Sequence, residues 1–119
     1  MGSFELRTEG QGSSRVNVIV LTGDLDSYSA PRLRELFDEL LQEDSDRIVL
    51  DCAALNYVDS SGLGTLVSAL KQISDRSGVL ALAGPQESVL RVLRITGLEN
   101  LFPIYASTDE ACKACALPR

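Results

Sequence analysis

Two short segments carry the side chains that could do chemistry in this chain. One is the turn Gly23-Asp24-Leu25-Asp26, and the other is the run Val58-Asp59-Ser60-Ser61-Gly62-Leu63-Gly64. The first offers carboxylates, and the second offers hydroxyls beside two glycines that let a ligand or another backbone approach closely. The chain contains no histidine, which removes Ser–His and Cys–His nucleophile pairs and most general-base chemistry at neutral pH.

Four aspartates could be imagined as a magnesium site like that of a phosphotransfer enzyme: Asp24, Asp26, Asp51 and Asp59. Such an enzyme also needs a nucleophile or base and a phosphate-binding Lys or Arg, and none is suitably spaced. A P-loop is excluded because no Lys follows the glycines at Walker spacing. A dinucleotide-binding fingerprint is excluded because its third glycine is missing. We expect no catalytic residue, no metal and no cofactor, and the magnesium-dependent phosphotransfer enzyme stays a weaker alternative.

Ser60 and Ser61 stand where a helix is expected to begin. Either hydroxyl is a natural N-cap, because its oxygen can accept a backbone N–H of the first helical turn. The simplest interpretation is therefore a well-made strand-to-helix junction. Residue types and spacing do not choose between Ser60 and Ser61.

The elements that must position these segments alternate between strands and helices. Strands are predicted over residues 4–7, 16–21, 48–50, 79–83 and 104–105. Helices are predicted by apolar residues at helical spacing after Pro31, after Ser61 and within residues 88–96, and by the capping-box spacing of Ser107 and Glu110. Residues 51–59 are expected to form a loop, and Gly78 is expected to end the second helix. The inward face of that helix is predicted to comprise Leu63, Leu66, Val67, Leu70 and Ile73.

The order β-β-α-β-α-β-α-β-α predicts a single α/β domain over residues 1–119, with a mixed, mostly parallel five-stranded sheet and about four helices. The first strand is the candidate for antiparallel pairing at an edge. In such sheets functional groups gather at the carboxyl ends of the strands. Both polar segments fall at strand ends, so we expect them to meet.

Composition excludes several classes of partner. The net charge is −6, whereas binding to nucleic acid or to an anionic membrane surface needs clustered Lys and Arg. No apolar run is long enough to cross a bilayer. Residues 1–10 carry no apolar stretch typical of an export signal, so we expect a cytoplasmic protein.

The cysteines are expected to be free and without function. There are three of them, an odd number, and Cys112 and Cys115 form a C-x-x-C pair near the C-terminus. A redox or zinc role would need a second pair or the strand-turn-helix setting of thioredoxin. This pair lies instead in a predicted short helix.

Taken together, the two polar segments resemble the STAS domain family, and most closely its stand-alone anti-sigma-factor antagonists. The resemblance spans the chain in length, element order and both motifs. It implies a STAS-like fold with helices on one main face of the sheet. It also implies a binding protein, not an enzyme, that is phosphorylated on Ser60. The unphosphorylated form would bind a serine-kinase anti-sigma factor, which then frees its sigma factor, and a PP2C-type phosphatase would reverse the modification.

The resemblance further implies a partner-binding surface around Ser60. Its expected members lie on the two polar segments and the turn after the first: Asp26, Ser27, Tyr28, Asp59, Ser61, Gly62, Leu63 and Gly64. Tyr28 stands where some relatives carry a different side chain, which leaves the identity of the partner open. Some members of the family are instead subunits of stress-signalling or lipid-transport complexes, and the sequence separates these alternatives poorly.

Overall fold

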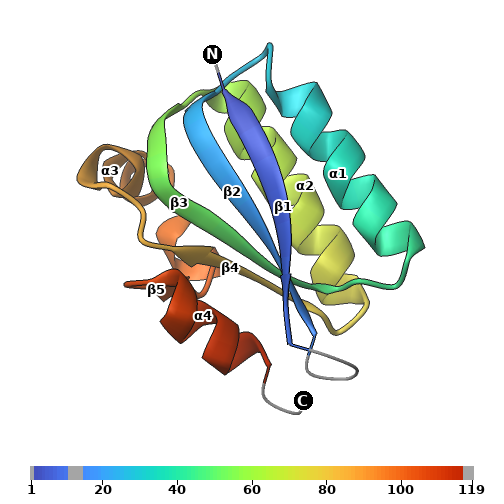
Figure 1. Cartoon of the computed structure of the whole chain (residues 1–119). Coiled ribbons are helices and arrows are strands. Elements are labelled where there is room, and N and C mark those ends of the chain that lie inside the picture. The colour runs from blue at the N-terminus through green and yellow to red at the C-terminus, as the bar shows by residue number, and fades with distance from the viewer. Residues whose placement is uncertain (1, 11–14, 117–119) are drawn as a thin grey trace.

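A five-stranded mixed sheet runs through the molecule (Figure 1). The computed structural model describes residues 2–10 and 15–116. The strands lie in the order in which they occur along the chain: β1 (Ser3–Glu9), β2 (Val16–Leu25), β3 (Arg47–Val58), β4 (Val79–Ala83) and β5 (Ile104–Tyr105). Strand β1 pairs antiparallel with β2 at one edge, and the other three pairings are parallel. The predicted fold class and the antiparallel edge strand are confirmed.

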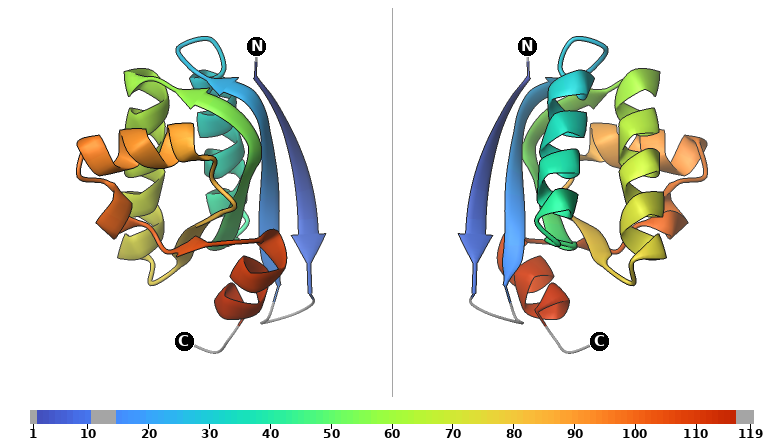
Figure 2. Two further views of the ribbon diagram at one scale, coloured as in Figure 1. Left: turned by 90° about the vertical axis from the view of Figure 1, so that its left-hand side faces the viewer. Right: turned by 90° about the vertical axis from the view of Figure 1, so that its right-hand side faces the viewer.

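The helices connect and cover the strands as the sequence predicts. They are α1 (Ala30–Gln42), α2 (Ser60–Asp75), α3 (Glu87–Ile95) and α4 (Thr108–Cys115), with a short 3-10 turn, η2 (Glu99–Leu101), after α3. The predicted capping box is present, because the Ser107 hydroxyl accepts the Glu110 N–H at 3.2 Å. Helices α1 and α2 lie side by side against one face of the sheet (Figure 2).

Two apolar clusters form the core, one on each face of the sheet. The larger one joins α1, α2 and α3 to β2, β3 and β4, with Ile19, Leu50 and Leu82 fully buried at its centre. The smaller one packs α4 on the opposite face, where Val49 and Ala111 are buried. The expectation of one main helical face is therefore correct for three helices and wrong for α4. Within the described ranges, no helix has the length and apolar composition needed to span a membrane.

Strand β3 is longer than the sequence suggests. Residues 51–58, expected to be a loop, continue the strand to Val58. Burial along this stretch does not alternate, because Cys52, Leu55 and Val58 are buried at intervals of three residues. A strand with irregular pairing loses the period of two that identifies strands in a sequence.

Strand β2 also runs further, from the expected end at residue 21 to Leu25. Its pairing with β3 contains register shifts between Val20 and Thr22 and between Gly23 and Asp24. After these irregularities Asp24 pairs with Tyr57, and Leu25 pairs with Val58. The two extended strands therefore end side by side, and the first polar segment is a strand end as well as a turn.

Helix α2 departs from the prediction at two points. Leu66 is buried, and Leu63 and Leu70 pack against the core, but Val67 faces solvent with 36% of its surface exposed. The helix ends in a Schellman arrangement in which Ser77, not Gly78, takes the left-handed conformation, with φ of 60°. The next position, Gly78, requires glycine because a Cβ there would overlap the backbone carbonyl oxygen of Asp46.

Candidate functional site

The two polar segments meet at one end of the sheet, as predicted from the parallel strand order. The backbone N–H of Asp59 donates to the carbonyl oxygen of Leu25 at 3.1 Å. This bond joins the residue after β3 to the last residue of β2. The turn at residues 26–29 and the first turn of α2 consequently lie near each other at the top of Figure 1.

Asp59, and neither serine, is the N-cap of α2. Its carboxylate oxygen Oδ1 accepts the N–H of Gly62 at 2.9 Å, so the expectation that Ser60 or Ser61 caps the helix is wrong. Asp59 has the extended backbone that an N-cap requires, and its side chain reaches the amide three residues on. Ser60 and Ser61 are the first two helical residues, and both are exposed. Neither hydroxyl makes a hydrogen bond to any described residue, so both are available for modification.

The two glycines of this segment do different work. A Cβ on Gly62 would lie 2.6 Å from the Leu25 carbonyl oxygen and 3.0 Å from a methyl group of Val58, so packing requires glycine there. A Cβ on Gly64 would meet nothing within 4 Å. Gly64 therefore costs helix stability without relieving any contact in the described structure.

Asp26 organises the turn between β2 and α1. Its Oδ1 accepts the N–H of Tyr28 at 3.0 Å and the N–H of Ser29 at 3.1 Å. The buried Ser29 hydroxyl lies 2.8 Å from the carbonyl oxygen of Asp24 and accepts the N–H of Asp26. The hydrogen bond from the Ser29 backbone lowers the pKa of Asp26 below its ordinary value. Asp26 is thus a fixed carboxylate beside the start of α2.

The other residues of the expected partner-binding surface differ in how much of each is exposed to solvent. Ser27 and Tyr28 project from the turn, and Tyr28 is 90% exposed. Gly62 is buried beneath the surface, and Leu63 packs partly into the core. The accessible part of the expected set is therefore smaller than the set as a whole: Ser27, Tyr28, Ser61 and Gly64, with Asp26 and Asp59 half-buried.

A hollow of about 330 Å³ lies between the starts of α1 and α2. Its lining combines residues from both helices: Ser27, Ala30, Pro31, Arg34, Ser60, Ser61 and Gly64. Arg34 was missed by sequence reasoning. Its position one turn after Ala30 and Pro31 places it on the same side of α1, but only the packing of α1 on α2 shows that this side faces the serines.

The four aspartates do not gather. Asp24, Asp26 and Asp59 lie at the strand ends, whereas Asp51 lies further back on β3, where its carboxylate accepts the N–H of Ala53 at 3.1 Å. Among residues 2–10 and 15–116, no group of three or more metal-ligating side chains is positioned to hold a metal ion. The phosphotransfer alternative gains no support from this geometry.

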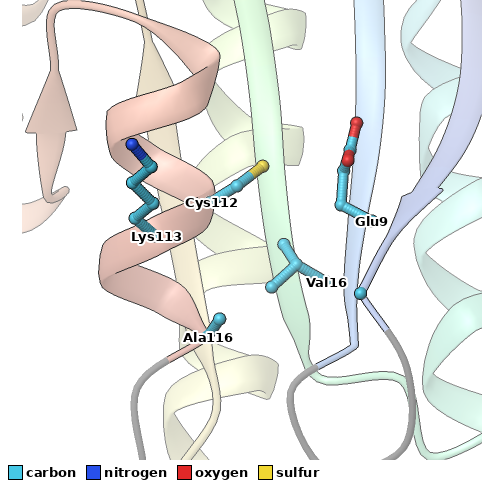
Figure 3. A pocket seen from close by; sticks show the side chains of 6 residues that line it. Glu9, Val16, Cys112, Lys113 and Ala116 are labelled. Atoms are coloured by element: carbon cyan, nitrogen blue, oxygen red, sulfur yellow. The ribbon is translucent and has the colours of Figure 1, made fainter.

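A second hollow, of about 200 Å³, lies at the opposite end of the sheet between α4 and the start of β2 (Figure 3). Cys112 projects into it from α4, next to Val16 and Glu9. Burial raises the pKa of the Cys112 thiol, and it raises that of Cys115 to about 11. Reactive cysteines have lowered values, so these thiols resemble packing residues.

Comparisons with known proteins agree with this arrangement. The sequence profile of the STAS domain matches residues 7–111. The chain is 34% identical over 102 residues to the anti-sigma-B factor antagonist of Bacillus subtilis, covering 85% of this chain and 89% of that protein. It is 33% identical over 103 residues to the anti-sigma F factor antagonist of Paenibacillus polymyxa, covering 86% and 88%.

Solved structures show the same fold. The anti-sigma factor antagonist SpoIIAA in its unphosphorylated form superposes with a TM-score of 0.81 at 23% identity, over 98% of this chain and all of that one. SpoIIAA of Bacillus in its phosphorylated form gives a TM-score of 0.71 at 22% identity, over 92% and 98%. The matched profile covers both polar segments and the strands that hold them. This chain belongs to the STAS domain family.

Proposed function

We propose that this protein is an anti-sigma-factor antagonist that binds a serine-kinase anti-sigma factor while unphosphorylated and is switched off by phosphorylation of Ser60. The observation that carries the proposal is the state of Ser60. Ser60 is exposed, it lines the same hollow as Ser27 and Arg34, and Asp59, not Ser60, is the N-cap of the helix. The names of the relatives from Bacillus subtilis and Paenibacillus polymyxa support the same class of function.

The position of Ser60 suits a phosphate that leaves the fold intact. As the first residue of α2, it holds its hydroxyl outside the core and outside the cap. A negative charge at a helix N-terminus is stabilised by roughly 0.3–1 kcal/mol through the helix dipole. Phosphorylation should therefore change the surface without unfolding the domain.

The same phosphate should expel the partner. It adds a charge of about −1.5 to −2 to a surface that already carries Asp26 and Asp59. An interface built around a neutral hydroxyl would then have to bury a dianion, which costs roughly 2–5 kcal/mol. The anti-sigma factor, once released, would bind its sigma factor again, and a PP2C-type phosphatase would restore the active form.

The test combines phosphate incorporation with binding. A cognate serine-kinase anti-sigma factor with ATP should phosphorylate the wild type and Ser61→Ala, and should leave Ser60→Ala unmodified. Ser60→Ala should still bind the kinase, and ATP should no longer release it. Ser60→Asp should bind about 10-fold or more weakly while melting at a temperature no lower than wild type. Wild-type affinity in Ser60→Asp, or incorporation that persists in Ser60→Ala, would contradict the proposal.

A further inference from the structure

Arg34 is the one cationic side chain among the described residues that line the hollow beside Ser60. It reaches the hollow from α1, whereas Ser60, Ser61 and Gly64 reach it from α2. Arg34 and the two serines therefore border the same hollow from neighbouring helices. The guanidinium is charged, whereas the two serine hydroxyls are neutral unless a phosphate is added.

The present contact of Arg34 is weak. Its Nη2 lies 3.5 Å from the hydroxyl oxygen of Thr65, at the upper limit for a hydrogen bond. No carboxylate within the described ranges forms an ion pair with Arg34, whereas Arg32 on the same helix lies 3.5 Å from Glu35. A guanidinium has five N–H donors, so most of those on Arg34 remain available to a ligand.

The buried Thr65 shows where the Arg34 guanidinium lies relative to α2. The Thr65 hydroxyl donates to the carbonyl oxygen of Ser61 at 3.1 Å and accepts from Arg34. These contacts place the Arg34 guanidinium near the first turn of α2. Gly64 lies one turn after Ser60 and carries no side chain, and the space where its Cβ would be is open. A larger group on Ser60 therefore has room to reach the guanidinium.

We propose that Arg34 binds the phosphate of phosphorylated Ser60 and so forms an ion pair between α1 and α2 that exists only in the phosphorylated form. This inference rests on the phosphorylation of Ser60 proposed above. A phosphate offers three acceptor oxygens, and the planar guanidinium fork matches two of them at once. The weak contact with Thr65 is then exchanged for a charge-assisted one. The pair also offsets the repulsion between the phosphate and the carboxylates of Asp26 and Asp59.

The test needs phosphoserine at a defined position and no kinase. Phosphoserine is inserted at residue 60 during translation, and the second pKa of its phosphate is measured by phosphorus NMR titration in wild type, Arg34→Gln and Arg32→Gln. A nearby cation favours the dianion, so this pKa should be lower with Arg34 present, by about 0.5–1 unit. Arg32→Gln removes a charge from the same helix outside the hollow and should match wild type. Arg34→Lys should recover part of the difference.

Thermal melts of the unphosphorylated variants establish that each one folds. A phosphate pKa that is unchanged in Arg34→Gln, or shifted equally in Arg32→Gln, would overturn the inference. So would phosphoserine at residue 61 responding to Arg34→Gln while phosphoserine at residue 60 does not. A cognate kinase that fails to modify Ser60 would contradict the proposed function and leave the titration result standing, so the two failures are distinguishable.

Discussion

Gly62 lies so close to the end of β2 that a Cβ on it would come within 2.6 Å of the carbonyl oxygen of Leu25. The same oxygen accepts the N–H of Asp59. The first turn of α2 is therefore seated directly on the last residue of β2. The distance between the serines and the Asp26 turn is set by this backbone contact and does not depend on a side chain that could change rotamer.

The two glycines of the serine segment should respond oppositely to the same substitution. Gly62→Ala should destabilise the domain by about 1–3 kcal/mol, because the methyl group overlaps the Leu25 carbonyl. Gly64→Ala should stabilise it by roughly 0.5–1 kcal/mol, since alanine favours helix and meets no neighbour. Urea denaturation measures both.

Gly64→Ala should also weaken binding to the proposed anti-sigma-factor partner, because Gly64 lies on the expected partner-binding surface and lines the hollow beside Ser60. Isothermal titration with that partner measures the affinity, and the urea denaturation above shows that any loss of affinity does not come from a destabilised fold. Unchanged affinity in Gly64→Ala would assign that glycine no role in recognition.

The residue that caps α2 and the proposed phosphoacceptor are two different residues, Asp59 and Ser60. Asp59→Ala should cost about 0.5–2 kcal/mol, because it removes the acceptor for the N–H of Gly62. Ser60→Ala should change stability by less than about 0.5 kcal/mol, because its hydroxyl bonds to no described residue. Thermal melts of the two variants compare them directly, and an equal loss in both would mean that Ser60 shares the capping role.

Asp26 should contribute a pH-dependent part of the stability. Its folded pKa is lowered from the ordinary 3.8, mainly by the hydrogen bond from the Ser29 backbone. The contribution should therefore be complete above that ordinary value and be lost as the pH falls through the lower folded pKa. Asp26→Asn keeps an acceptor oxygen but cannot titrate. Urea melts from about pH 6 to pH 2 should show wild type and Asp26→Asn converging at the acid end, and a constant difference would contradict the expectation.

Two adjacent residues of α2, the buried Leu66 and the exposed Val67, test which face of the helix packs against the sheet. Leu66→Ala should cost about 2–5 kcal/mol, since its side chain is 3% exposed within the larger apolar cluster. Val67→Ala should change stability by no more than about 0.5 kcal/mol, because Val67 faces solvent. Chemical denaturation distinguishes them, and a comparable loss at both positions would mean that α2 is rotated relative to the sheet.

The thiols should be slow to react in the folded protein. Burial raises the pKa of Cys52 to about 12 and that of Cys115 to about 11, and it also raises that of Cys112. Little thiolate is then present near neutral pH. Alkylation followed by mass spectrometry should modify Cys112 slowly in the folded protein, and should modify Cys52 and Cys115 only after unfolding.

The cysteines of α4 should also be dispensable. We expect the double variant Cys112→Ser, Cys115→Ala to keep both the fold and partner binding, and stoichiometric zinc in the purified protein would count against this.

Sequence reasoning found the elements whose periodicity is clean. The continuous apolar run predicted β4 correctly because this strand is buried on both faces. Helical spacing predicted α1 and α3 correctly because each helix buries one regular face. It failed over residues 51–58, where the pairing of β2 with β3 is irregular and the burial follows no period of two. The strand end at Leu25 was missed for the same reason.

At the site, residue types located both polar segments, and the parallel strand order placed them together. The sequence could not decide which polar residue caps α2, because Asp59 and both serines are all good N-caps. That choice depends on where the backbone turns after Val58. The role of Arg34 could not be predicted for a different reason. Its position near Ser60 depends on how α1 packs against α2, and the two residues are 26 positions apart, so no local sequence pattern relates them.

The parallel pairing of β2 with β3 has a consequence for when this surface comes into being. The Asp26 turn and the serine segment are joined only when the chain has crossed over, through the segment that contains α1, to place β3 beside β2. A synthetic peptide copying residues 58–64 would contain the proposed phosphoacceptor, Ser60, and lack the strands and helix that position it. We therefore expect the proposed partner to bind the folded domain and not to bind this peptide or an unfolded chain.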